Sequence, residues 1–324
     1  MPSIYTHNYF ARDSYKKLEK ENIHKLNNKL YYEIFAQSFD NLFYYNFYKL
    51  GKGKEYRNLG YYAQKHNVWL YFKNMLEYIK KHKLYNDEIL GYLYGSLSHY
   101  ALDSTCHPYI HYISGKLNKK NIKETKKYIG NHAKNEIMID SIYYYKDNKD
   151  KYSKYKLYKD LIPKTTFPKD LVDTISYTFK TTFDKDNIGE IFNKSYNHMR
   201  LSYKYLMYDK TGLKKVIYKI VDMITPFKHY KAYNYSHYIN TPDYSVMNSK
   251  RNTWIHPITG EKHNESFEDL YSIAQDKFIS YVKICNKFLN GKCKINDVEK
   301  VLGNISYSSG LDLKIKPIFK YFKY

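Results

Sequence analysis

Apolar side chains recur every three or four positions along much of this chain, and lysines and other polar residues occupy the positions between them. This spacing is typical of amphipathic helices, which bury one face against the rest of the protein. Glycine and proline interrupt helices, and the chain has only 13 and 8 of them among its 324 residues. The pattern predicts helices over residues 63–85, 87–104, 121–145, 187–208, 212–224 and 265–289.

The helix predicted over residues 87–104 has signals at both ends. Asn86 or Asp87 can cap its first turn with a side-chain oxygen. Pro108 disfavours helical geometry at the residue before it. We therefore expect this helix to end before His107, and a loop to follow.

Alternating apolar and polar positions between Asn-Gly or Asp-Gly turns, the usual sign of a β-hairpin, are absent from the sequence. We therefore predict an all-α fold with a single, mostly helical domain over residues 1–324. Lysines, tyrosines and two prolines make residues 146–185 a less regular region. A C-terminal helical extension is expected at 250–324.

The charge balance favours anionic partners. Lys and Arg number 54 against 32 Asp and Glu, which gives a formal net charge of +22. Phosphates, an anionic membrane surface or nucleic acid would complement this charge, although scattered lysines also suit a solvated surface. The three cysteines form no Cys-x-x-Cys pair, so neither a disulfide framework nor a thiolate zinc site is indicated.

The N-terminal residues lack the apolar stretch of a secretory signal. No apolar run approaches the ~20 residues that a membrane-spanning helix needs. We therefore expect a soluble protein that is cytoplasmic by default, with export by another route as the alternative.

The segment SHYALDSTCHPYIHY, residues 98–112, concentrates candidate metal ligands. His99 and Asp103 stand four residues apart, on one face of the predicted helix. His132 and Glu136 repeat this spacing in NHAKNEIMID, where Asp140 extends the same face. One such pair is more often a surface pair, but two pairs beside a His-Pro loop favour a metal site. Imidazole and carboxylate ligands suit Zn²⁺.

Other segments fit the same interpretation. THNYFA stands near the N-terminus, followed by FAQSFDNLFYY and GYYAQKHNVWLYF, then SHYALDSTCHPY and NHAKNEIMID. In order and spacing, these motifs resemble the zinc-dependent phospholipase C family, which is related to the S1/P1-type nucleases. The segment at residues 252–274 resembles the tail of a bacterial branch of that family that lacks signal peptides.

The resemblance implies a helical domain that binds two or three zinc ions. It implies these ligand sets, one for each ion: Asp40, His66, His99 and Asp103; Asp103 with His7 and the N-terminal backbone; and His107, His132 and Glu136. The step from Asp103 to His107 is two residues shorter than in the secreted enzymes of the family. His111 is therefore an alternative ligand to His107.

The resemblance also implies a phosphodiester hydrolase in which zinc activates water, so that no serine or cysteine nucleophile is needed. Asp40 is the candidate general base. A phospholipid substrate is favoured over nucleic acid, because residues 102–108 depart from the Gly-Asp-x-His-Gln-Pro-Leu-His motif of the nuclease branch. An S1/P1-like nuclease and a non-catalytic, metal-stabilised binding protein are the alternatives. The oligomeric state is not indicated.

Overall fold

The computed structural model describes residues 4–23, 26–49, 51–116, 126–147, 156–224, 231–237 and 242–323. Over these residues the fold is all-α, as predicted, with one short hairpin. The α-helices are α1 (Ile4–Lys20), α2 (Leu30–Phe35), α3 (Lys54–Ala63), α4 (Val68–His82), α5 (Asp87–Ser114), α7 (Asn131–Asp147), α8 (Leu157–Asp160), α9 (Lys169–Phe183), α10 (Ile188–Ser202), α11 (Leu213–Ile224), α12 (Phe267–Leu289) and α13 (Ile295–Leu302).

Shorter elements connect these helices. The hairpin pairs its two strands in antiparallel register, with Trp254 opposite His263. The short elements are the 3-10 helices η1 (Ser38–Tyr44), η2 (Lys126–Tyr128), η5 (Ala232–Tyr235) and η6 (Tyr244–Met247), the π-helix η4 (Tyr203–Met207), and the strands β1 (Trp254–Ile255) and β2 (Lys262–His263). In the described part of the chain, no helix is long and apolar enough to cross a membrane.

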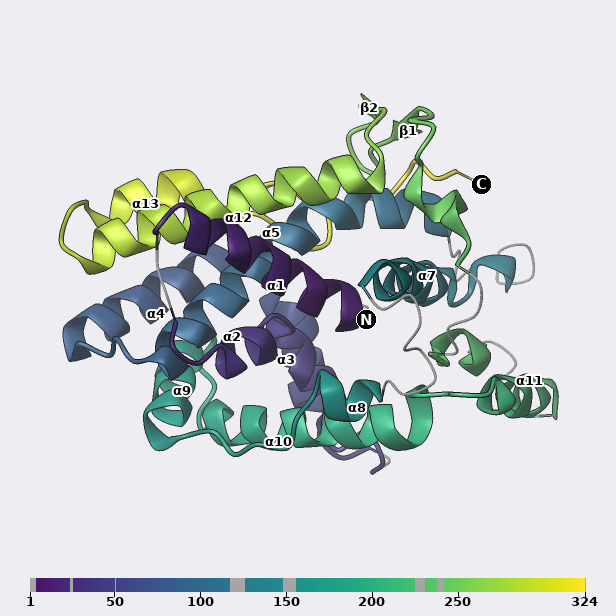
Figure 1. Ribbon diagram of the computed structural model, residues 1–324, viewed down its shortest axis with the longest axis horizontal. Helices are drawn as coiled ribbons and strands as arrows, with labels where there is room; N and C mark the ends of the chain where they lie inside the picture. The colour runs from purple at the N-terminus through teal and green to yellow at the C-terminus, as the bar shows by residue number, and fades with distance from the viewer. Residues whose placement is uncertain are drawn as a thin grey trace.

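Helix α5 is the central helix of the fold. Buried residues lie on all of its sides, which requires neighbours all round. It packs against α1, α2, α7 and α12, and Figure 1 shows α1 and α12 alongside it. As expected, the helix starts with a cap, because the side chain of Asn86 accepts a hydrogen bond from Ile89 N.

The prediction that this helix ends before His107 is wrong, because α5 continues through Pro108 to Ser114. A proline inside a helix costs ~3 kcal/mol. Burial of Tyr109 and Ile110, both 3% exposed, offsets this cost, since a large apolar side chain contributes about 1.5–3 kcal/mol. Residues on both sides of Pro108 therefore belong to one helix.

Two glycines let α2 approach α5 closely. A Cβ at Gly91 would lie 2.8 Å from Tyr32 N, and one at Gly95 would lie 2.6 Å from Tyr32 O. Any other residue would push the two helices apart at these contacts. Because α2 lies directly on α5, the η1 segment that follows α2 reaches the polar side chains of α5.

Most predicted helices correspond to observed ones, with shifted ends. Residues 187–208, 212–224 and 265–289 contain α10 with η4, α11 and α12. The helix predicted at 63–85 is α4, which starts only after Asn67, a residue in the left-handed conformation with φ 53°. The helix predicted at 121–145 is α7, which starts at Asn131, and residues 117–125 lie outside the described residues.

Residues 146–185 are more regular than we expected. They contain the 15-residue helix α9, which buries Leu171, Ile175 and Phe179 against α4 and α10. Pro168 precedes this helix, where a proline does not interrupt its hydrogen bonds. Residues 148–155 lie outside the described part of the chain. In the expected extension at 250–324, α12 and α13 are helical, and an irregular tail follows α13.

Candidate metal centre

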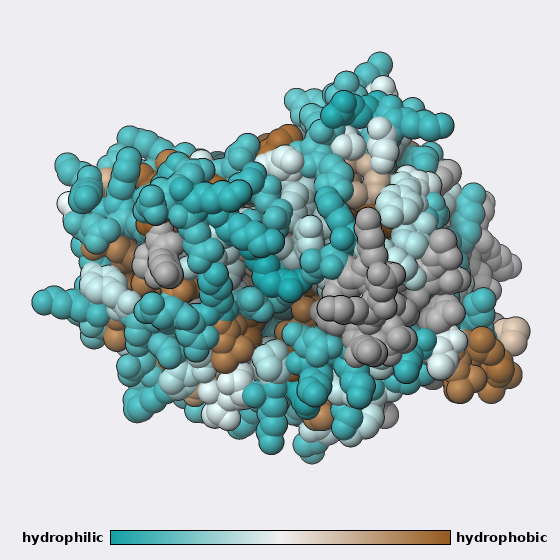
Figure 2. All heavy atoms as spheres, in the orientation of Figure 1, coloured by the Kyte–Doolittle hydropathy of each residue, from teal (hydrophilic) through white to brown (hydrophobic). Residues whose placement is uncertain are grey.

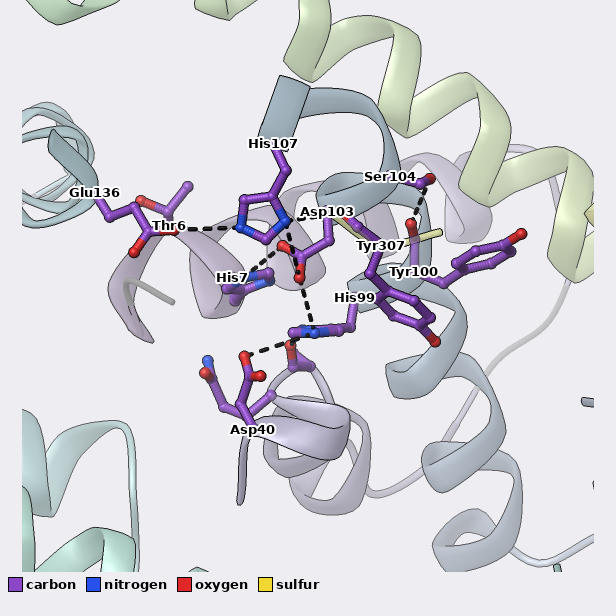
Figure 3. A network of polar contacts seen from close by, with 12 residues as sticks. Thr6, His7, Asp40, His99, Tyr100, Asp103, Ser104, His107, Glu136 and Tyr307 are labelled. Carbon is purple, nitrogen blue, oxygen red and sulfur yellow. Dashed lines mark hydrogen bonds and ion pairs between the residues drawn. The ribbon is translucent and has the colours of Figure 1, made fainter. Parts of the chain in front are cut away.

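Three polar residues stand at successive i,i+4 positions on one face of α5 (Figure 3). Asp103 is the middle one. Its Oδ2 lies 3.1 Å from His99 Nε2 and 3.5 Å from His107 Nδ1. Because α5 is buried on all sides, this face supplies polar groups to the interior of the protein.

Two residues from other elements complete a first set of ligands. His7 of α1 places Nε2 3.2 Å from Asp103 Oδ1, and Asp40 of η1 places Oδ2 3.6 Å from His99 Nε2. We name His7, Asp40, His99 and Asp103 the deep group, since none is more than 4% exposed. One ligand atom from each of the four lies within 4.8 Å of the others.

A second set lies at the far end of the same face. Glu136 of α7 places Oε1 3.0 Å from His132 Nε2 and 3.3 Å from His107 Nε2. These three residues, which we name the outer group, also offer ligand atoms within 4.8 Å of one another. The side chains of His132 and His107 are 28% and 15% exposed, so the outer group is open to solvent.

Backbone carbonyls fix the two imidazoles of α5 that belong to these groups. Nδ1 of His99 donates to Ala36 O at 2.9 Å, and Nδ1 of His107 donates to Tyr307 O at 2.9 Å. A ring that donates from Nδ1 and is neutral has an unprotonated Nε2, which is the form that binds metals. In both rings this nitrogen faces a carboxylate. Two acceptors at such short distances repel each other unless a proton or a metal ion lies between them.

The deep group contains polar atoms that make no hydrogen bond although they are buried. They are His7 Nδ1, Asp40 Oδ2, His99 Nε2 and Asp103 Oδ2. Leaving such an atom unsatisfied costs about 1–3 kcal/mol. A cation would satisfy several of them at once, and nitrogen and carboxylate donors are the set that zinc takes in proteins. The residues present therefore fit bound zinc.

Burial and nearby charges shift the pKa of several side chains in the site. Burial raises the pKa of Asp40 to about 7, and the nearby charge of Asp103 adds to this effect. Burial alone would lower the pKa of His107, but Asp103 and Glu136 raise it to about 9. The pKa of Asp103 is well below its usual range, because three imidazoles outweigh the effect of its burial. The imidazoles thus favour the charged form of Asp103, whereas burial disfavours the charged form of Asp40.

Asp140 holds the first turn of α1. Its carboxylate accepts hydrogen bonds from Tyr5 N at 3.1 Å, Thr6 N at 2.6 Å and Thr6 Oγ1 at 2.7 Å. His7 is the next residue along the chain. Asp140 therefore fixes the backbone that carries a ligand of the deep group, rather than the imidazole itself.

The structure does not bring His66 to the deep group. His66 is exposed, its ring stacks on Tyr62 with centroids 3.9 Å apart, and its Nδ1 lies 3.0 Å from Tyr62 O. Gln64, two residues earlier, is buried and donates from Nε2 to Asp40 Oδ1 at 2.6 Å. The chain leaves α3 at Ala63 with Gln64 directed inward, which leaves His66 on the surface.

Between the two alternatives on α5, it is His107 that lies in the outer group. The ring of His111 is nearby, with its centroid 4.8 Å from that of His132, and its Nε2 contacts Ser308 Oγ at 2.9 Å. Burial lowers the pKa of His111 well below its usual range, and the charge of His132 adds to this effect. The N-terminal backbone, expected as a further ligand, lies in residues 1–3, outside the described residues.

Both groups open into one cavity of about 390 Å³. Asp40 and Asp103 of the deep group and His107 and His132 of the outer group line it. Its remaining lining residues are Phe43, Tyr61, Gln64, Lys65, His111, Ser114, Gly115, Tyr128, Ile129, Gly130, Ala133, Tyr235 and Ser308. A small molecule in this cavity would contact ligands of both groups.

Fold and site together define an all-helical protein whose histidines and carboxylates form two adjacent metal-binding groups. Residues 6–185, more than half of the chain, match the sequence model of the family described as zinc dependent phospholipase C, so the chain belongs to this family. The matched stretch contains both ligand groups. No curated protein and no solved structure gives a significant match.

Proposed function

We propose that this protein is a zinc-dependent phosphodiester hydrolase that removes the head group of a phospholipid, as a phospholipase C does. The observation that carries the proposal is the buried pairing of imidazole nitrogens with carboxylates at the wall of a cavity. Membership in the zinc dependent phospholipase C family supports the substrate class.

The deep and outer groups would hold two or three zinc ions. Zinc bound there would acidify water and stabilise the negative charge that develops on a phosphoryl group. Asp103 contributes to both groups by position, because its carboxylate contacts His7, His99 and His107. It would therefore fix the spacing between neighbouring metal positions.

Asp40 would act as the general base. It lines the cavity, and Gln64 holds its Oδ1 while its Oδ2 makes no hydrogen bond. That oxygen, which lies 3.6 Å from His99 Nε2, would accept a proton from a water molecule that enters the deep group. Positioned general bases contribute about 10²–10⁴-fold to a rate. Lys65 lines the same cavity and would attract an anionic phosphate.

A nuclease is the second candidate. Tyr61, Tyr128 and Tyr235 line the cavity, and aromatic rings can stack on nucleic acid bases. The net charge of +22 would also favour a polyanion. A protein that binds metal without catalysis is the outcome if no phosphodiester is cleaved.

Hydrolysis by the zinc-loaded protein tests these candidates. The substrates are a soluble nitrophenyl phosphocholine, a short-chain phosphatidylcholine and single-stranded DNA and RNA. We expect both choline esters to be cleaved, and Asp40→Asn to lose about 10²–10⁴-fold in rate while keeping most of its zinc. Asp186→Asn, an exposed carboxylate in the turn after α9, is the matched control. Cleavage of nucleic acid alone would favour the nuclease, and no cleavage would refute catalysis.

A further inference from the structure

Helix α11 has its apolar face directed away from the protein. Its apolar residues are 40–75% exposed, and no residue of this helix is buried. These residues are Leu213, Val216, Ile217, Ile220, Val221, Met223 and Ile224. Figure 2 shows a brown patch at the lower right edge, where Figure 1 places α11. Amphipathic helices normally bury this face, so an outward apolar face marks a binding surface.

The polar side of α11 attaches it to the protein. Lys214 Nζ donates to Tyr208 O at 2.7 Å, and Tyr218 OH donates to Leu206 O at 2.8 Å. At the start of the helix, Lys215 N donates to Asp209 Oδ2 at 2.9 Å. Among the described residues, these three hydrogen bonds therefore hold the polar side of the helix toward the protein.

Lysines converge behind this helix. A cavity of about 280 Å³ is lined by residues that belong to α7, α11, η2 and η5 or that directly adjoin these elements in the chain. None of its lining residues is acidic. We name it the lysine cavity after these residues: Lys127, Lys134, Lys215, Lys219 and Lys231. Burial lowers the pKa of Lys215, and the charges of Lys219 and Lys134 add to this effect. The cavity is thus a concentrated positive site on the polar side of α11.

The lysine cavity adjoins the cavity of the metal centre. Asn131 and Lys134 of α7 line the lysine cavity, whereas His132 and Ala133 line the metal cavity. The same division holds along η5, where Tyr233 and Asn234 face one cavity and Tyr235 faces the other. Helix α7 and η5 therefore separate the lysine cavity from the cavity of the proposed active site.

We propose that α11 and the lysine cavity dock the protein on an anionic phospholipid membrane, with the apolar face of α11 inserted between head groups. A basic helix with one apolar face is the form that binds membrane interfaces, and anionic lipid is complementary in charge to the lysines. A second copy of the chain fits less well, since it carries the same lysines and the same net charge of +22. The choice of a lipid surface as the partner rests on the proposed function.

Co-sedimentation of the zinc-loaded protein with vesicles tests the proposal. We expect binding to vesicles of phosphatidylglycerol and phosphatidylcholine, weaker binding to phosphatidylcholine alone, and loss of binding as salt screens the charges. Ile217→Gln with Ile220→Gln should weaken binding about tenfold or more, because both side chains lose apolar contact with lipid. The matched control is Ile315→Gln with Ile318→Gln, an equally exposed pair in the C-terminal tail, which should bind like wild type.

Substitution of two lysines distinguishes the contribution of charge to vesicle binding from the contribution of apolar insertion. Lys215→Gln with Lys219→Gln should weaken binding to anionic vesicles, by about fivefold for each charge at low salt. The control pair is Lys16→Gln with Lys20→Gln, on exposed positions of α1. Equal binding by the two lysine variants would overturn the role of the lysine cavity.

Two further results would overturn the docking proposal. One is that wild type binds no vesicle. The other is that wild type is a dimer in solution that Ile217→Gln with Ile220→Gln converts to monomer, without any binding to lipid. Cleavage of a soluble substrate is measured separately, so that vesicle binding without hydrolysis would refute the proposed function and leave the docking surface standing. Hydrolysis of the soluble substrate without vesicle binding would support the proposed function and refute the docking surface.

Discussion

The deep and outer groups share one face of α5 but differ in their surroundings. Elements of the core supply the deep group, and its four side chains are at most 4% exposed. The outer group joins the last turns of α5 to α7, with His132 28% exposed. A charge lost from the deep group leaves its partners buried and uncompensated, whereas water can solvate the outer group. Loss of a charged ligand should therefore lower the free energy of unfolding more in the deep group than in the outer group.

The deep group should respond most strongly to the loss of one charge. Asp103→Asn removes the carboxylate that contacts three imidazoles. Breaking a buried charged pair typically costs about 3–5 kcal/mol, so we expect a loss of this size in the free energy of unfolding, together with loss of bound zinc and of hydrolysis. Urea unfolding and elemental analysis measure these effects.

Asp186→Asn is the matched control for this variant, because Asp186 is 68% exposed and contacts only a surface lysine in the described structure. Its effect should stay within about 1 kcal/mol. If both variants unfold at the same urea concentration as wild type, Asp103 does not compensate buried charge as the structure indicates.

The outer group should lose metal without a large loss of stability. His132→Ala removes one ligand whose ring is partly exposed. We expect about one zinc ion fewer per chain, and a change in the free energy of unfolding below that of Asp103→Asn when both are measured without metal. His111→Ala is the comparison variant and should keep its zinc, since His111 lies beside the outer group. Loss of zinc from His111→Ala alone would make His111 the ligand.

The smallest effect is expected at His66, the residue that the structure leaves on the surface. His66→Ala should keep wild-type zinc content and stability, because it loses only a stacking contact with Tyr62. Gln64→Ala should cost about 1–3 kcal/mol, because Asp40 loses a buried hydrogen-bond donor. Isothermal titration with zinc and thermal unfolding distinguish the two variants. Zinc loss from His66→Ala would show that His66 reaches the metal.

The local part of the site followed from the sequence. Neighbours four residues apart share a helix face, so spacing alone pairs His99 with Asp103 and His132 with Glu136, and the fold brings each pair together. The end of α5 could not be predicted in the same way. Whether a helix continues past Pro108 depends on the burial of residues beyond it, which only the tertiary contacts determine.

Contacts between distant segments account for what the sequence did not reveal. Asp140 binds the backbone of Thr6, and the carbonyl of Tyr307 orients His107 across 200 residues of chain. These contacts use ordinary polar groups that form no motif. Gln64 rather than His66 points toward Asp40 because of where α3 ends. The periodicity of apolar residues does not locate a helix end to within two residues.

Zinc content of the purified protein tests the account most directly. The protein is prepared without chelator, and metal is measured by elemental analysis alongside Asp103→Asn as a ligand-deficient control. We predict two or three zinc ions per wild-type chain, and a rise in unfolding temperature when zinc is returned to chelated protein, since ligands that bind only the folded state stabilise it. Less than about one zinc ion per chain, with no thermal shift on adding zinc, would contradict the assignment of both groups as metal sites.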